Sequence, residues 1–443
     1  MVLFNLLITI LLILFLIVKL RFNPAMSLIL AAMYMGIASG IGLAETVSTI
    51  SSGFGSMMTS IGLSIGFGIM LGQVLAACGG IHSIANAMLR VFGKEKSPIA
   101  TGLTGFIASI PVFYDVVYVI IVPLAKGMAR VTGMGLGIFV GALVAGAACT
   151  HCFVPPTPGP LAVAALLGID IGKMIGVGLI IGAIAFFCAL PLYKKFFLNR
   201  GWFNPETDID HSAEALEVKD QEFTKLPSFG ASIFPIVLPV FLILIGTVTN
   251  TIMGSVPPII AFLSDKVVAL LLGAIAAFLL AVQTIPRDRV EAALTSAMSA
   301  SGLVLLITGA GGSLAAVLGA SGIGDFLANV VTQYHINVVL LTWLTAVVIR
   351  LAQGSGTVAM MTAAGLMAPV VVGMDISMVW VAFAAATGAV FCGHVNDSGF
   401  WISAKMANLT TMGGFKTYTT MTGIIAVLGL VLTFVGSLLL PTL

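Results

Sequence analysis

The sequence predicts an all-α polytopic membrane protein with two inverted-topology halves, each holding a re-entrant hairpin and a broken transmembrane helix. The first observation is composition: 59% of the residues are hydrophobic and only 8% are charged, whereas soluble domains carry about 25% charged residues. The second is the recurrence of apolar runs that would cross about 30 Å of hydrocarbon as helices. The third is that polar, helix-breaking stretches interrupt these runs at matching places in the two halves.

Composition also excludes several classes of protein. A net charge of +2 is too small to argue for a nucleic-acid partner. The five cysteines lie mostly in or beside apolar segments, and the C-x-x-C pair Cys149 and Cys152 has no second pair to complete a zinc site. We therefore expect small buried thiols, with no metal and no organic cofactor.

The uninterrupted apolar runs are the predicted spans. The first, Val2–Val18, lacks a preceding basic stretch and a small-residue cleavage motif, so we interpret it as a retained span and not as a signal peptide. The others are Ala25–Leu43, Met57–Ala77, Met134–Ala148, Met174–Leu192, Ile233–Val248, Val267–Val282, Leu303–Leu318, Met378–Phe391 and Thr422–Leu440.

Two further apolar stretches, Ile99–Ala125 and Val338–Val371, are too long for one span and are interrupted near the middle, so each is interpreted as a re-entrant hairpin. The basic clusters fall on one side if the N-terminus is outside, the first hairpin enters from the cytoplasm and the second enters from the other face. Arg350 is the exception. We expect its side chain to reach the outer surface; pairing with Asp325 or with a bound carboxylate is the alternative.

The segment between the halves is polar. Residues 1–192 are the predicted N-terminal transmembrane half, 193–228 a linker and 229–443 the C-terminal transmembrane half. The linker holds seven of the seventeen acidic residues and no long apolar run. We therefore expect a soluble, acidic, cytoplasmic linker with room for a short surface helix.

The polar interruptions mark the predicted site. Pro111–Asp115 turns the first hairpin and Gln353–Thr357 turns the second. At a similar distance after each hairpin a span is broken, at Thr150–Pro160 and at His394–Gly399, and each break has a histidine at its start. Irregular backbone and ionisable groups at membrane depth are tolerated only where they line a cavity or are packed in protein. We therefore expect the two tips and the two breaks to meet near the bilayer midplane.

The segments that carry a family resemblance are Pro111–Asp115 with the following Val119–Leu124, His151 with Pro155–Pro160, Gln353–Ala359 and His394–Trp401. In this order, along the whole chain, they resemble the gluconate permease family of proton symporters. The resemblance implies a secondary transporter of the bacterial inner membrane, related in fold to ion-transporter-like carriers. Members carry gluconate, related sugar acids, short hydroxy acids or D-serine, and the His394–Trp401 motif favours the gluconate branch.

The chemistry of the residues gives the predicted binding roles. N–H groups at the N-termini of half-helices bind a carboxylate without a free cation, and proline and glycine at the breaks expose such groups. The predicted substrate-binding residues are Tyr114, Thr150, His151, Thr157, Gly159, Gln353, Gly354, Ser355, Gly356, Thr357, His394, Asn396, Asp397 and Ser398. Close helix packing is the alternative for the small residues among them.

Asp115, Asp397 and His151 are the predicted proton-coupling residues. Burial raises the pKa of a carboxyl group toward neutrality, which suits reversible proton binding, and histidine titrates near physiological pH. We prefer Asp115 as the carrier because its chain neighbours are aromatic or apolar, and we expect Asp397 to bind substrate or to cap a half-helix. A structural role is the alternative for all three residues.

The predicted function is proton-coupled uptake of gluconate or a related sugar or hydroxy acid by alternating access. The expected partners are the organic acid, protons and the lipid bilayer; many such carriers form homodimers, although no stretch here reports an oligomeric state. A sodium-coupled carboxylate carrier, with Asn396, Ser355 or Thr157 near the ion, is the less favoured alternative, and a D-serine carrier is another. A channel would need a charged ring or filter repeat, and an enzyme would need a nucleophile–base set or a metal cluster.

Overall fold

The computed structural model describes residues 2–20, 22–210, 226–322, 333, 337–372, 374, 376–395 and 397–442. Within these ranges the regular elements are helices, and one isolated β-bridge joins Ile209 to Leu409. Seven helical segments of the described chain are long and apolar enough to cross a membrane. The predicted all-α membrane class is therefore confirmed.

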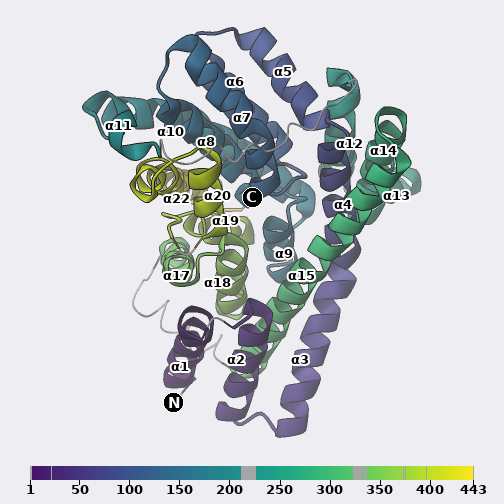
Figure 1. The fold of residues 1–443 in the computed structure, drawn as a ribbon. Coiled ribbons are helices and arrows are strands. Elements are labelled where there is room, and N and C mark those ends of the chain that lie inside the picture. The colour runs from purple at the N-terminus through teal and green to yellow at the C-terminus, as the bar shows by residue number, and fades with distance from the viewer. Residues whose placement is uncertain are drawn as a thin grey trace.

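The N-terminal part of the chain runs from the bottom of the view to its top and back toward the centre (Figure 1). Its helices are α1 (Val2–Leu14), α2 (Pro24–Ala38), α3 (Leu43–Met57), α4 (Leu63–Ala77), α5 (Gly80–Phe92), α6 (Ser97–Ala108), α7 (Tyr114–Thr132), α8 (Leu136–Phe153), α9 (Pro158–Leu166) and α10 (Ile171–Phe196). A π-helical turn, Met58–Gly62, joins α3 to α4 without a break.

The C-terminal part follows a short helix, α11 (Pro205–Asp208). Its helices are α12 (Phe229–Met253), α13 (Pro258–Ser264), α14 (Lys266–Thr284), α15 (Arg287–Ala320), α17 (Val338–Gln353), α18 (Gly356–Val371), α19 (Met378–Gly388), α20 (Ser398–Met406), α21 (Thr411–Gly414) and α22 (Thr420–Leu439). A π-helical turn, Phe415–Thr419, precedes α22.

Two helical hairpins turn where the sequence predicts. Residues 109–113 join α6 to α7 and contain Pro111, which has no N–H to continue a helix. Gly354 ends α17 in the left-handed conformation, with φ +84°, and Ser355 caps α18 by accepting the Val358 N–H over 3.3 Å. In Figure 1 the first hairpin lies in the upper part of the molecule and the second in the lower part.

Two helices are broken close to the predicted places. The first break, residues 154–157, lies between α8 and α9, and the second, residues 389–397, lies between α19 and α20. The prediction that His151 opens the first break is wrong, because α8 continues to Phe153. The helix ends where Val154 becomes extended before Pro155, as the residue before a proline is disfavoured in the helical region.

Two helices are longer than predicted. The helical segment Leu43–Ala77 has 35 residues and α15 has 34, whereas the predicted spans began at Met57 and Leu303. Their extra turns are rich in Ser, Thr and Gly. Small residues in the extra turns of α3 and within the predicted span of α15 let the two helices cross closely. A Cβ atom on Gly53 would lie 2.6 Å from the carbonyl oxygen of Gly312, and the Ser313 hydroxyl donates to the Ile50 carbonyl over 2.8 Å.

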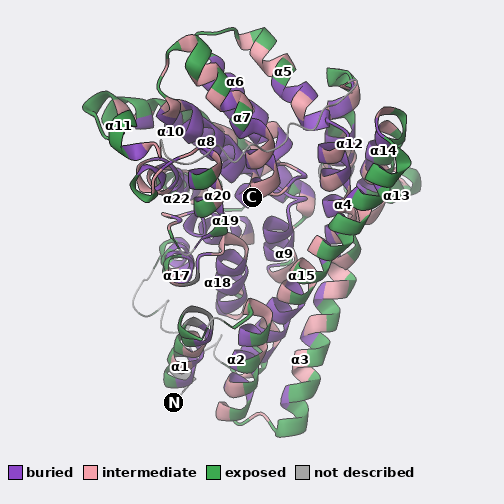
Figure 2. Cartoon of the chain, in the orientation of Figure 1, coloured by how far each residue is buried: buried purple, intermediate pink, exposed green. Residues whose placement is uncertain are grey.

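The core lies where the broken helices and the second hairpin pack together. Figure 2 shows α8, α9, α18 and α19 largely in the buried colour, whereas α3 and the outer sides of α14 and α15 carry more exposed residues. Large apolar side chains such as Phe241, Ile259 and Leu279 are exposed on α12, α13 and α14. Exposed apolar area of this extent fits a lipid-facing perimeter.

The predicted linker begins as ordered structure. α10 extends past residue 193 to Phe196, and the buried carboxylate of Asp208 in α11 accepts two hydrogen bonds from Lys416 Nζ, over 2.9 and 3.0 Å. The start of the linker is thus fixed to the C-terminal part of the chain. Residues 211–225 lie outside the described ranges, and the division into two halves stays a prediction.

Candidate functional site

A cavity of about 420 Å³ lies where the two hairpin tips meet the broken helices. Its walls come from the first tip, the end of α8, the middle of α15, the second tip, the break after α19, the start of α20 and the segment around Tyr418. The predicted site residues that line it are Tyr114, Asp115, His151, Gly354, Ser355, Gly356, Thr357, Asp397 and Ser398. Segments far apart in the sequence therefore form one polar chamber.

An ion pair dominates one wall of this cavity. Arg350 donates through Nη2 to Asp397 and through Nη1 to the Gly354 carbonyl, and only 5% of Arg350 and 6% of Asp397 is exposed. The Tyr418 hydroxyl donates to the same carboxylate oxygen over 2.6 Å, and the Gly399 N–H donates to the other over 2.9 Å. Asp397 thus caps α20 and neutralises a buried cation, which makes the pair hard to dismantle one member at a time.

The expectation that Arg350 reaches the outer surface is wrong. Arg350 lies in the last turn of α17, beside the hairpin tip, so its side chain turns into the protein interior. Its Nε is buried and has no hydrogen-bond partner among the described residues. A donor is therefore left over in the cavity wall after Asp397 and Gly354 are satisfied. Asp325, the alternative partner from the sequence, lies outside the described ranges.

Asp115 lines the same cavity as Asp397 but, unlike Asp397, is not ion-paired with any described residue. It is the second residue of α7, is half-buried, and makes no hydrogen bond or ion pair with any described residue. Its neighbour Tyr114 is fixed: the Tyr114 hydroxyl lies 2.7 Å from Ser403 Oγ, and its ring meets the Tyr418 ring edge-on at 5.8 Å between centroids. The first tip therefore presents an unpaired carboxyl on a rigid support.

His151 lines the same cavity as Asp115 and Asp397. It lies in the last turn of α8, and its ring centroid is 6.0 Å from that of Phe113. Its Nδ1 is buried and has no hydrogen-bond partner in the described part of the chain. All three predicted proton-coupling residues thus line one chamber, although only Asp397 is ion-paired there.

Two predicted threonines do not line the cavity. The Thr150 hydroxyl donates to the Phe106 carbonyl over 2.8 Å, which ties α8 to α6. The Thr157 hydroxyl donates to the Val154 carbonyl over 2.6 Å, inside the break itself. Both hydroxyls are buried and already used, so the packing alternative describes them.

Two other predicted residues also lie outside the cavity. Gly159 is where α9 meets α18: a Cβ atom there would lie 2.6 Å from Met360 Sδ. His394 is half-buried, and its Nε2–H donates to the Leu351 carbonyl over 3.1 Å. Asn396 lies outside the described residues, and of Gln353 the structure describes only the backbone, which ends α17.

Sequence reasoning missed two polar contributors to the cavity, Tyr418 and Thr422, and gave a third, Arg350, only as an alternative carboxylate partner. Arg350 carried a signal, since a cation inside an apolar run marks a functional site by default. Tyr418 and Thr422 carried none, because Thr and Tyr are unremarkable in the segment that starts the last span. Thr422 accepts the Gly393 N–H over 3.2 Å and so orients the second break.

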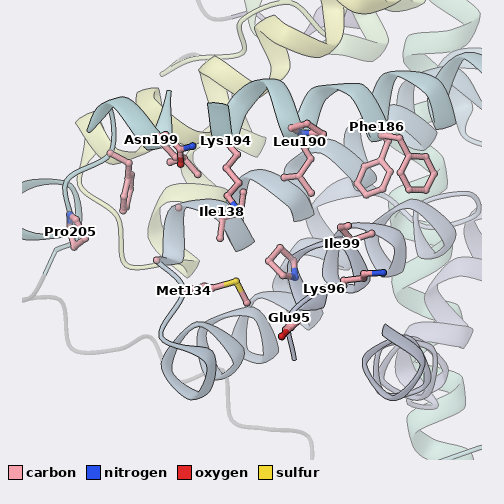
Figure 3. Close-up of a pocket in the computed structure, with 17 residues that line it drawn as sticks. Glu95, Lys96, Ile99, Met134, Ile138, Phe186, Leu190, Lys194, Asn199 and Pro205 are labelled. Carbon is pink, nitrogen blue, oxygen red and sulfur yellow. The ribbon is translucent and has the colours of Figure 1, made fainter. Parts of the chain in front are cut away.

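A larger cavity, of about 580 Å³, lies between the starts of α6 and α8 and the end of α10 (Figure 3). Apolar side chains such as Ile138, Phe186 and Leu190 line it, together with the charged Lys96 and Lys194. It shares no residue with the cavity around Arg350. In the described part of the chain, no three His, Cys, Asp or Glu side chains gather as metal ligands would.

Comparison with known proteins shows the family of this chain. Residues 1–439 match the family described as GntP family permease. The chain is 33% identical to the gluconate permease of Pseudomonas aeruginosa, over 98% of this chain and 97% of that protein. It is 34% identical to the D-serine transporter DsdX of Escherichia coli K12, over 98% of each.

A solved structure shares the fold. The YdaH transporter of Alcanivorax borkumensis superposes with a TM-score of 0.61 at 14% identity, over 94% of this chain and 98% of that one. The relatives are permeases and not enzymes. The chain therefore belongs to the GntP family permeases and is a multi-pass transporter of the bacterial inner membrane.

Proposed function

We propose that this permease takes up gluconate or a related sugar or hydroxy acid together with protons, by alternating access. Two of its relatives are named for gluconate and for D-serine, and both compounds carry a carboxylate beside a polar group. The observation that carries the proposal is Arg350, a buried cation in the cavity wall with an Nε that no described residue uses.

Binding of the carboxylate follows from that geometry. A guanidinium offers N–H groups in a planar arrangement that matches a carboxylate. In Arg350 the Nε–H is the donor that no described residue uses. The starts of α18 and α20 also line the cavity, through Gly356, Thr357 and Ser398, and helix N-termini favour anions. Hydroxyls of Ser355, Thr357 and Ser398 would meet the hydroxyls of the acid. The volume of about 420 Å³ falls within the range of roughly 300–1,000 Å³ usual for ligand pockets.

Coupling to protons follows from the charges in the cavity. Arg350 and Asp397 form a neutral pair, so an ionised Asp115 already leaves one negative charge. A substrate carboxylate adds a second, and an uncompensated buried charge costs several kcal/mol. A proton on Asp115 removes that cost, so acid and proton bind together more favourably than either alone. Asp397 would remain the counter-ion of Arg350, and His151 is the alternative proton acceptor.

Alternating access would use the pairing of the helices. Within each part, a hairpin arm packs against the first piece of a broken helix: α6 against α8, and α17 against α19. Between the parts, the other arm packs against the second piece: α7 against α20, and α18 against α9. Such reciprocal exchange supports an inverted repeat of residues 1–192 and 229–443 with two re-entrant hairpins. The hairpins and broken helices would then move together against α2–α4 and α12–α15.

Uptake of labelled gluconate into proteoliposomes, with an inward proton gradient and no sodium, tests the proposal. Accumulation that a protonophore abolishes is the expected result. Uptake that requires sodium and does not depend on the proton gradient would overturn proton coupling. If none of labelled gluconate, glycerate and 3-hydroxybutyrate accumulates in the proteoliposomes, the assignment to sugar acids and hydroxy acids is overturned.

D-Serine is the second candidate substrate, and one observation favours it. Asp115 lies in the same cavity as Arg350 and has no described partner, so it could meet an ammonium group while Arg350 meets the carboxylate. Competition separates the candidates. If D-serine displaces labelled gluconate at a lower concentration than unlabelled gluconate does, Asp115 is an ammonium-binding group and the sugar-acid assignment fails.

A further inference from the structure

A third cavity, of about 740 Å³, shares Asp115 with the cavity around Arg350, which we call the substrate cavity. We call it the vestibule. Its walls come from the end of α4, the start of α5, the outer face of α7 and the first turns of α15. Its polar and ionisable lining residues are Gln73, His82, Asp115, Arg289 and Ser296. None of these except Asp115 belongs to the substrate cavity.

The two cavities lie in series. On α7 the vestibule is lined at Asp115, Val119 and Pro123, which are one helical face at intervals of four residues. At 1.5 Å per residue this face runs about 12 Å away from the hairpin tip. On α15, Arg289 and Ser296 line the vestibule, and Leu303, seven residues further along the same face, lines the substrate cavity. A route from the substrate cavity therefore passes Asp115 and leads outward between α7 and α15.

The chemistry of the vestibule fits water and not lipid. Ionisable side chains that face hydrocarbon are costly and rare, whereas His82, Asp115 and Arg289 all line this space. Exposure also rises along the route, because Asp115 is half-buried while Pro123 and Arg289 are exposed. Arg287 and Arg289 open α15, and the excess of basic residues in cytoplasmic loops places this end at the cytoplasm.

We propose that the vestibule is the cytoplasmic passage of the substrate and that Arg289 is a second, transient carboxylate-binding position in it. This inference rests on the proposed function, since it takes the cargo to be an organic anion. Arg289 makes no ion pair with any described residue. A cation at the mouth of a cleft raises the local concentration of an anion and its rate of entry. The acid would thus exchange between Arg350 at the centre and Arg289 at the mouth.

Neutralising Arg289 tests the binding position. Arg289→Gln is compared with Arg287→Gln. Arg287 carries the same charge and lies two residues before Arg289, but it does not line the vestibule. We expect Arg289→Gln to raise the KM for efflux from the cytoplasmic side by about tenfold and to weaken its salt dependence. The maximal rate should change little, and Arg287→Gln should match the unaltered protein. Equal KM values for the two variants would overturn the assignment of Arg289.

Thiol labelling tests the passage itself and needs no transported substrate. Ser296 lines the vestibule and is replaced in Ser296→Cys. Met298 lies on the same helix, is 56% exposed and does not line the vestibule, so Met298→Cys is the control. An anionic, membrane-impermeant methanethiosulfonate applied from the cytoplasmic face should modify Ser296→Cys faster than Met298→Cys and faster than the native cysteines. Equal reactivity, or modification from the opposite face only, would overturn the passage. Fast modification of Ser296→Cys that gluconate fails to slow supports the passage and counts against gluconate as the cargo.

Discussion

The two hairpin tips line the same cavity but carry opposite chemistry. The first tip holds Asp115 on an aromatic support, with no described partner for its carboxyl group. The second tip holds Arg350, which Asp397, Gly354 and Tyr418 surround. Both tips turn through a short irregular segment and both line the same cavity. The two turns thus present different groups to one cavity, and the residue types at each tip decide what each group can do.

We infer from this difference that the two tips have separate roles in transport. A carboxyl without a partner can gain or lose a proton without breaking another contact. A cation held by a rigid counter-ion can accept a second anion through its unused N–H, and its own charge stays fixed because arginine does not deprotonate in proteins. We therefore expect substitutions at the second tip to abolish binding and substitutions at the first tip to uncouple transport from protons.

The largest effect should follow removal of Arg350. Arg350→Met takes away the carboxylate partner and leaves Asp397 buried without its counter-ion, which costs about 3–5 kcal/mol of stability when a buried pair is broken. Uptake should fall at least about 100-fold, consistent with the loss of a charged hydrogen-bonding partner. Radiolabelled uptake and thermal unfolding in detergent measure the two consequences.

A double variant separates folding from binding in this experiment. Arg350→Met with Asp397→Asn removes both charges, so its unfolding temperature should recover toward that of the unaltered protein. Uptake should stay lost, because the carboxylate still has no cation. Recovered uptake in the double variant would show that Arg350 serves only to neutralise Asp397.

Next in size is Asp115→Asn, which should abolish accumulation driven by the proton gradient and leave exchange of labelled for unlabelled acid. The amide keeps the shape of the carboxyl but takes up no proton, so the charge argument predicts transport without coupling. Counterflow measured beside gradient-driven uptake reports both quantities. Unchanged accumulation in Asp115→Asn would show that Asp115 is not the proton carrier and would leave His151 and Asp397 as the candidates.

The tips and breaks could be predicted from the sequence because proline, glycine and polar residues interrupt apolar runs there. Pro111, Gly354 and the Val154–Pro155 pair end helices for local reasons, which need no knowledge of the fold. Arg350 could not be placed, because hydropathy does not report the direction in which a side chain leaves a short helix. Its partner Asp397 lies 47 residues further along the chain and becomes adjacent only when the second hairpin packs against the second break.

The long crossing helices failed prediction for a related reason. The first turns of the Leu43–Ala77 segment and of α15 are rich in Ser, Thr and Gly, which in isolation indicate a loop. In the folded chain Ile50 and Gly53, in the extra turns of α3, contact Ser313 and Gly312 of α15, which lie within its predicted span. Thr150 and Thr157 were predicted to bind the ligand, but their hydroxyls donate to the Phe106 carbonyl, which the fold brings to Thr150, and to the Val154 carbonyl within the first break.

A smaller effect should follow loss of the Tyr418 hydroxyl. Tyr418→Phe removes the hydrogen bond of 2.6 Å to Asp397 and keeps the ring against Tyr114. A hydrogen bond to a charged group contributes about 1.5–3 kcal/mol, so the position of Asp397 and Arg350 should loosen and the KM should rise about tenfold. Proton-driven accumulation should persist at saturating substrate. A loss of coupling with an unchanged KM would instead place Tyr418 on the proton route.

The smallest effect should be at Thr150, where the sequence predicted substrate binding and the structure shows helix packing. Thr150→Val removes the hydrogen bond to the Phe106 carbonyl and leaves that buried acceptor without a partner, which costs about 1–3 kcal/mol of stability. Thr150→Ser keeps the hydroxyl and is the matched control. Both variants should show an unaltered KM for the acid, and only Thr150→Val should unfold at a lower temperature. A raised KM with unchanged stability in Thr150→Val would return Thr150 to the binding site and bring the first break into contact with substrate, as the second tip is proposed to be.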